Sequence, residues 1–97
     1  MNYKFHPEAR LEYLEAIAFY NERQPQLGSK FTIEVEQAIE RILEAPDRWF
    51  FLEEDVRRCL THLFSYGILY TVENDHILIV AVMHCSRKPG YWKDRLK

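Results

Sequence analysis

The stretch FSYGILYTVENDHILIVAVMH, Phe64–His84, contains two runs rich in β-branched and aromatic residues on either side of a short polar segment. Such runs are typical of β-strands, and the intervening ENDH is a tight-turn sequence. We therefore predict two neighbouring antiparallel strands. Immediately upstream, VRRCLTHL alternates imperfectly between apolar and polar residues and predicts a third strand. The sheet needs other elements to cover its apolar face.

Two amphipathic helices are predicted before these strands. The segment HPEA places a proline where a helix can begin, because its missing N–H is unpaired in a first turn. Apolar residues then recur at helical spacing to about Arg23. Pro25 cannot continue this helix, Gly28 permits a turn, and Ser29 is a suitable cap for a second helix. The residues expected to face the sheet are Ala9, Tyr13, Ala16, Ile17 and Tyr20 in the first helix and Phe31, Val35, Ala38, Ile39 and Ile42 in the second.

With a short strand in NYKF, Asn2–Phe5, these elements give the order β-α-α-β-β-β. We expect an α+β fold in which a helical hairpin packs on a small antiparallel sheet, followed by a short C-terminal element. The chain of 97 residues fits a single domain, residues 1–97. Two cysteines are too few for an oxidised scaffold, and the N-terminus has no apolar run long enough for a signal peptide or membrane span. We therefore expect a soluble cytoplasmic protein.

Charge is distributed unevenly along the chain. Residues 1–54 contain 6 Lys and Arg against 11 Asp and Glu, whereas residues 55–97 contain 7 against 4. The acidic half is explained by solvated helix faces, with Glu12 among their carboxylates. After Met83 the apolar strand changes into a cationic, aromatic tail, SRKPGYWKDRLK, that ends at Lys97. A basic surface of this kind attracts either phosphate groups or an acidic protein segment.

The motifs of common cofactor enzymes and hydrolases are absent from the sequence. It contains no GxxxxGK[ST], GxGxxG or GxSxG. Cys59, His62, His84 and Cys85 could each bind a metal ion. Residues one or three apart on a strand point to opposite faces, however, so their spacing does not favour a zinc site. We expect no metal and no cofactor.

Two functional interpretations of the basic residues remain open, beside a structural one. Arg57 and Arg58, at the start of a strand, could join the tail cations in holding a phosphate, while His84 or Tyr91 moves a proton during RNA cleavage. The same cations could instead bind an acidic protein. The structural interpretation is that the arginines protect an edge strand and that Trp92 packs on the sheet as part of the core.

The order of motifs resembles one protein family across nearly the whole chain. These motifs are FHPEARLEYLEAIAFY, a second Glu-rich helix ending in AP, and VRRCLTHLFSYGILYTVENDHILIVAVMHCSRKPGYWKDRL. Together they resemble the RelE/ParE superfamily of toxins from type II toxin–antitoxin systems, and VAVMHCSRKPGYWKDR is similar to its plasmid-stabilisation members. The resemblance implies a growth-inhibiting toxin, and a cognate antitoxin that wraps it with a segment that folds on binding.

The superfamily has two kinds of target. RelE-like members cleave mRNA on the ribosome, and that resemblance would make Arg58, His84, Arg87 and Tyr91 catalytic. ParE-like members inhibit DNA gyrase without catalysis.

Gly67 and Leu60 stand where a cleaving member carries arginine and lysine, and a net charge of −2 is unfavourable for docking on rRNA. The resemblance therefore favours a gyrase inhibitor, with an mRNA endonuclease and an inactive binding module as alternatives. The target-binding residues expected are Arg57, Arg58, Arg87, Lys88, Tyr91, Trp92, Lys93 and Arg95.

Overall fold

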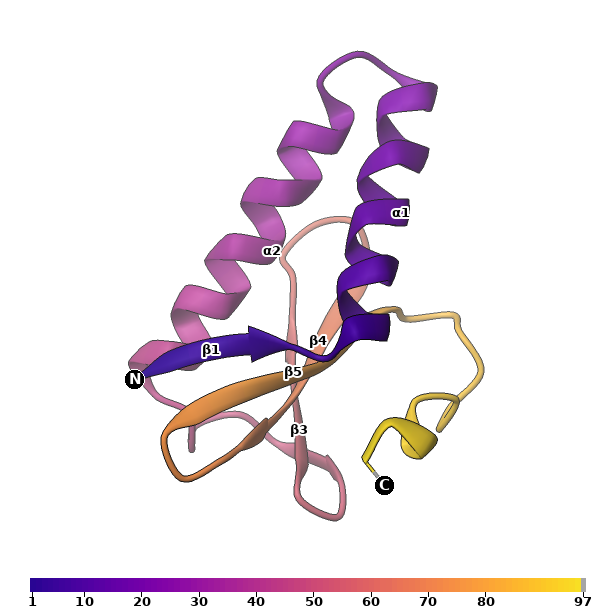
Figure 1. Ribbon diagram of the computed structural model, residues 1–97. Helices are drawn as coiled ribbons and strands as arrows, with labels where there is room; N and C mark the ends of the chain where they lie inside the picture. Colours follow the sequence, from indigo (N-terminus) through magenta and orange to yellow (C-terminus); the bar gives the residue numbers. More distant parts are fainter. Residues whose placement is uncertain (97) are drawn as a thin grey trace.

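Five strands form one sheet in the order β1-β5-β4-β3-β2, and two helices form a hairpin that covers part of it (Figure 1). The computed structural model describes residues 1–96. Its elements are β1 (Asn2–Phe5), α1 (Pro7–Arg23), α2 (Leu27–Glu44), β2 (Phe51–Glu53), β3 (Val56–Leu60), β4 (Tyr66–Val72), β5 (His76–His84) and a short 3-10 helix, η1 (Lys93–Leu96). We call the segment after β5, residues 85–96, the tail.

The predicted α+β fold is confirmed, and the sheet has two features that the sequence pattern did not indicate. β1 pairs in parallel with β5, so the sheet is mixed rather than antiparallel. A further strand, β2, pairs antiparallel with β3 and takes its place at the sheet edge. All three residues of β2 are exposed, and a strand without alternating burial leaves no period-two signal in the sequence.

The helices cover one face of the sheet with the residues expected to do so. The helix-side core contains the predicted residues of α2, all buried, and those of α1, of which Ala9 and Ala16 are the most buried.

The start of α2 differs from the prediction. It begins at Leu27 rather than after a Ser29 cap, and Gly28 lies inside its first turn. A Cβ atom at Gly28 would lie 2.5 Å from the side chain of Asn21, so glycine is what allows the two helices to approach here.

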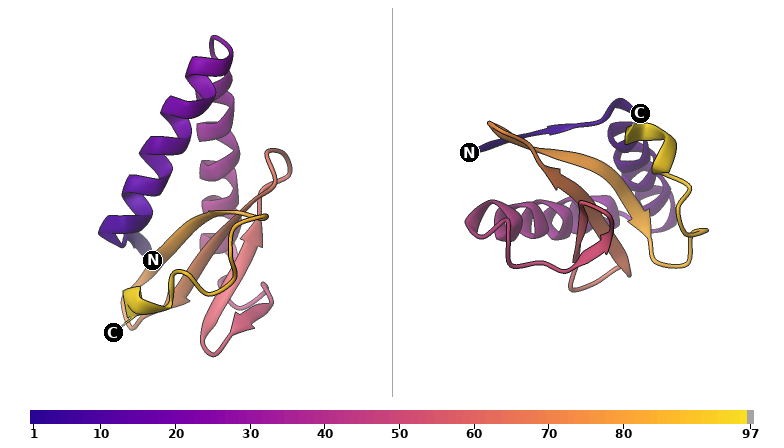
Figure 2. Two further views of the ribbon diagram at one scale, coloured as in Figure 1. Left: turned by 90° about the vertical axis from the view of Figure 1, so that its right-hand side faces the viewer. Right: turned by 90° about the horizontal axis from the view of Figure 1, so that it is seen from below.

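The opposite face of the sheet carries a second core, which the tail covers. Figure 2 shows the tail (yellow) returning along the sheet after β5. A β-bulge shifts the register between β4 and β5, and the sequence neighbours Val80 and Ala81 both join this core. Trp92, 2% exposed, packs against them. The prediction that Trp92 serves the core is therefore confirmed. The members of this tail-side core are Val56, Leu69, Val80, Ala81, Met83 and Trp92.

Truncating Trp92 should destabilise the whole domain. We expect Trp92→Ala to lower the free energy of unfolding by about 3 to 5 kcal/mol, because it leaves a cavity between the tail and the sheet. The buried Nε1 of Trp92 has no hydrogen-bond partner within residues 1–96, so Trp92→Phe should cost much less. Urea unfolding compares both with Lys88→Ala, an exposed change expected to stay within about 0.5 kcal/mol. Equal losses for Trp92→Ala and Lys88→Ala would contradict the prediction.

Stability should fall at alkaline pH because of two tyrosines, the half-buried Tyr66 and the buried Tyr70. Burial raises the pKa of Tyr66 and of Tyr70 to about 12, above the usual 10.0. Their contribution to stability is therefore complete below pH 10, the pKa of an unfolded tyrosine, and is lost as the pH rises towards 12.

Tyr70 also donates a 2.6 Å hydrogen bond to the carbonyl of Pro46. We expect the free energy of unfolding to decrease above pH 10, and to decrease less steeply in Tyr70→Phe. Urea unfolding across this range measures both slopes. Identical slopes for the two proteins would show that Tyr70 does not contribute.

Candidate functional site

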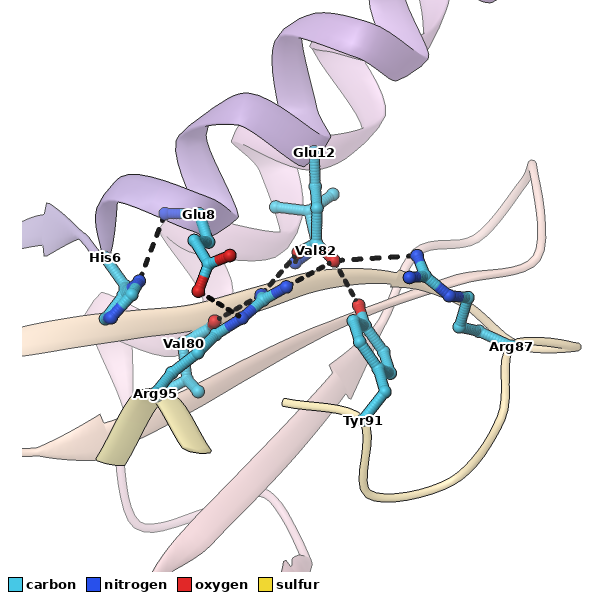
Figure 3. Close-up of polar contacts among 8 residues, drawn as sticks. All are labelled: His6, Glu8, Glu12, Val80, Val82, Arg87, Tyr91 and Arg95. Atoms are coloured by element: carbon cyan, nitrogen blue, oxygen red, sulfur yellow. Dashed lines mark hydrogen bonds and ion pairs between the residues drawn. The ribbon is translucent and has the colours of Figure 1, made fainter. Parts of the chain in front are cut away.

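The tail is fastened to α1 through Glu12, a residue expected to be a solvated helix carboxylate. Its side chain is only 13% exposed, so this expectation was wrong. The guanidinium of Arg95 donates to both carboxylate oxygens, at 2.8 and 3.0 Å. The hydroxyl of Tyr91 and the backbone N–H of Val82, at 3.1 Å, donate to the same carboxylate (Figure 3). One side chain of α1 thus binds both the tail and β5.

The Glu12–Arg95 pair also satisfies backbone groups of β5 beyond the end of β1. β1 pairs with β5 only as far as Ile79. Farther along, the N–H of Val82 donates to Glu12 and the carbonyl of Val80 accepts a 3.0 Å hydrogen bond from Arg95. Backbone groups near a protein interior need such partners. Two side chains here take the place of a neighbouring strand.

Tyr91 lies between two guanidinium groups. Arg87 stacks on its ring with the guanidinium carbon 4.0 Å from the ring centroid, and the corresponding distance for Arg95 is 5.0 Å. Burial raises the pKa of Tyr91 above its usual value, and the hydrogen bond to Glu12 raises this pKa further. The Tyr91 hydroxyl is therefore held protonated as a hydrogen-bond donor.

Arg58 and Arg87 line one cleft of about 290 Å³ between the β2–β3 hairpin and the tail. Arg58 comes from β3 and Arg87 from the loop after β5, which also carries the exposed Lys88. A Cβ atom at Gly67 would lie 3.1 Å from the Arg58 side chain, so the glycine leaves room for it. Of the predicted target-binding cations, Arg58 and Arg87 line this cleft together with Trp92, and Lys88 is exposed in the same loop as Arg87.

The other predicted target-binding residues are engaged within the fold. Arg57 precedes Arg58 on β3 and points the other way: it donates to the carbonyls of Asp47 and Trp49, at 3.1 and 2.8 Å, and stacks on Phe51. Lys93 forms a 2.7 Å ion pair with Glu53. Arg95 is bound to Glu12, and Trp92 belongs to the tail-side core. Lys97 lies outside the described residues.

The residues expected of a nuclease do not share one cavity. His84 is exposed at the end of β5, where its Nδ1 lies 2.7 Å from the Ser86 hydroxyl and its ring packs edge-on against Tyr66. Tyr91 donates its hydroxyl to Glu12. Neither His84 nor Tyr91 lines the cleft that contains Arg58 and Arg87.

The metal-capable residues are dispersed as well. Cys59 is buried in the helix-side core, whereas Cys85 is exposed in the tail. Among residues 1–96, no group of three or more His, Cys, Asp and Glu side chains is arranged to hold a metal ion. Within the same residues, neither helix is long and apolar enough to cross a membrane.

Removing the charge of Glu12 should destabilise the fold. Glu12→Gln leaves the Arg95 guanidinium, only 9% exposed, without its counter-charge. Because a buried charge without a partner is costly, we expect a loss of about 2 to 4 kcal/mol in the free energy of unfolding. Glu15→Gln, an exposed change on the same helix, should stay within about 0.5 kcal/mol. Chemical unfolding of the two variants checks this, and a Glu12→Gln protein as stable as Glu15→Gln would exclude a structural role for the pair.

The chain is similar to known proteins in sequence and in fold. The sequence model of the family described as "ParE toxin of type II toxin-antitoxin system, parDE" matches residues 3–89. Among solved structures, the chain is similar to one from the "Chromosomal ParDE TA system from P. aeruginosa". That likeness has a TM-score of 0.75 at 12% sequence identity and covers 87% of this chain and 95% of the other. No curated protein matches significantly. The family match spans most of the chain, and the solved structure has the same fold; the chain therefore belongs to the ParE toxin family of type II toxin–antitoxin systems.

Proposed function

We propose that this toxin inhibits DNA gyrase by binding, without catalysis, and that a cognate antitoxin neutralises it. The observation that carries this proposal is the state of Tyr91, the tyrosine that a nuclease would use for proton transfer. Its hydroxyl donates to Glu12, and burial holds its pKa above the usual value. A general acid or base must be within reach of the reacting atoms. Because the Tyr91 hydroxyl is used in a hydrogen bond within the fold, its state supports a binding role for the tail rather than a catalytic one.

The surface we assign to target binding consists of Arg58, Arg87 and Lys88. Arg58 and Arg87 line the same cleft, and Lys88 follows Arg87 in an exposed loop. Arg87 keeps 55% of its side chain exposed although it stacks on Tyr91. Cations presented in this way steer and bind an acidic protein surface. Tyr91, Trp92 and Arg95 then support this surface from within.

The alternative function is ribosome-dependent cleavage of mRNA. It is supported by the exposed position of His84, three residues before Arg87. In that case His84 would transfer the proton and the arginines of the cleft would hold the phosphate.

We place an antitoxin segment in the groove between α2 and the β3–β4 loop. This groove has a volume of about 380 Å³, and its lining includes Ile33 and Leu63, which are 54% and 64% exposed. Large apolar side chains exposed together are typical of a protein interface. The similar solved structure is described as a ParDE toxin–antitoxin system, in keeping with such a partner.

Two assays with purified protein test the target. We expect inhibition of gyrase supercoiling and intact mRNA on translating ribosomes; codon-spaced mRNA cuts with normal supercoiling would establish the alternative instead. Arg87→Ala should lose most gyrase inhibition and toxicity while remaining folded, because a surface cation contributes no more than about 0.5 kcal/mol to stability. Arg10→Ala, an exposed change on α1, is the matched control and should inhibit like the wild type. If the Arg87→Ala protein were fully active, the tail would not be part of the target-binding surface.

A further inference from the structure

Three side chains of the tail, Arg87, Tyr91 and Arg95, contact Glu12, and they differ in hydrogen bonding and in exposure. Arg95 donates to both oxygens of Glu12 and to the carbonyl of Val80, and only 9% of its side chain is exposed. Tyr91 is half-buried, and its hydroxyl donates a hydrogen bond to the same carboxylate. Arg87 is the group that keeps a large exposed surface. Arg95 and Tyr91 thus complete the fold, whereas Arg87 faces outward.

Arg87 is held in place by contacts that do not include a short hydrogen bond to the Glu12 carboxylate. Its Nη1 lies 3.8 Å from Glu12 Oε2, which is the distance of an ion pair rather than of a hydrogen bond. Its guanidinium carbon lies over the Tyr91 ring, 4.0 Å from the ring centroid. The donors of Arg87 therefore remain able to bind a carboxylate of another molecule. Stacking and a longer-range attraction fix its direction.

Without Glu12 this arrangement would be electrostatically unfavourable. The two guanidiniums approach the same ring, so Arg87 and Arg95 repel each other across Tyr91. The carboxylate of Glu12 attracts both and fixes the ring through the Tyr91 hydroxyl. Glu8 lies 3.8 Å from Arg95, but its side chain is 64% exposed, and it is too solvated to replace Glu12.

We infer that Glu12 is a positioning residue for target binding: through the Tyr91 ring and the Arg95 guanidinium it orients Arg87 towards an acidic group of the target protein. This rests on the proposed function, in which Arg87 contacts the target. Glu12 itself does not touch the target in this arrangement, since its carboxylate is enclosed by α1, β5 and the tail (Figure 3).

The test is a double-mutant cycle between Glu12 and Arg87, read by affinity for gyrase and by growth inhibition. Measurements are made at a temperature where every variant is folded. We expect Arg87→Ala and Glu12→Gln each to weaken binding at least about tenfold, as truncation of an interface arginine often does. The double variant should bind within about threefold of Arg87→Ala alone, because an orienting residue has nothing left to orient.

Matched controls separate positioning from simple loss of stability. Val35→Ala destabilises the helix-side core, away from the tail, and should leave affinity within about twofold of the wild type. Glu15→Gln changes an exposed charge on the same helix and should also bind normally. If Glu12→Gln does not fold, Glu12→Asp takes its place in the cycle, since it keeps the charge but withdraws the carboxylate by one methylene group.

Three outcomes would overturn the inference. Normal binding by Glu12→Gln beside a weak Arg87→Ala would show that Arg87 needs no positioning. Additive losses in the double variant would mean that Glu12 acts independently of Arg87. If Arg87→Ala kept full affinity and toxicity, Arg87 would not contact the target, and Glu12 would have no contact residue to position. If the wild type does not bind gyrase, the proposed target is wrong, and the same cycle read by growth inhibition still decides whether Glu12 acts through Arg87.

Discussion

A largely buried ion pair between α1 and the tail, Glu12 with Arg95, joins the three parts of this small protein. β5 extends beyond the end of its parallel neighbour β1, and the pair provides partners for the backbone of Val80 and Val82 there. The same contact brings the tail back over the sheet, where Trp92 closes the second core. Each half of the pair would be costly to bury alone. The helical hairpin, β5 and the tail are therefore stable in one relative arrangement.

The elements that could be predicted from the sequence are those whose signal is local. β5 spans the run His76–His84, and the apolar stripes of both helices face the sheet. β2 could not be predicted because its three residues are all exposed and do not alternate. The parallel pairing of β1 with β5 depends on the path of the whole hairpin between them. Periodicity reports which face of a segment is buried, but not which strand lies beside it.

The sequence indicated which residues to consider for the candidate site, but only partly how they lie relative to one another. Adjacent residues on a strand point to opposite faces, so Arg57 and Arg58 could have been separated from the sequence alone. Glu12 is three residues after Ala9 and four before Ala16, the buried residues of α1, and this spacing was an available signal of partial burial. Its partners are 70 to 83 residues away, and no local pattern identifies them. Two of the tail cations, Arg95 and Lys93, are in fact paired within the fold, with Glu12 and Glu53.

The long separation between Glu12 and Arg95 also sets an order of events during synthesis. The two residues lie 83 positions apart, and α1 leaves the ribosome long before residue 95 has been made. The helical hairpin can therefore form while the surface that carries Arg87 is still unassembled. The residues that line the apolar groove, from α2 and the β3–β4 loop, are likewise made before the tail residues that complete the cleft containing Arg58 and Arg87. Binding at this groove therefore does not require residues of the tail.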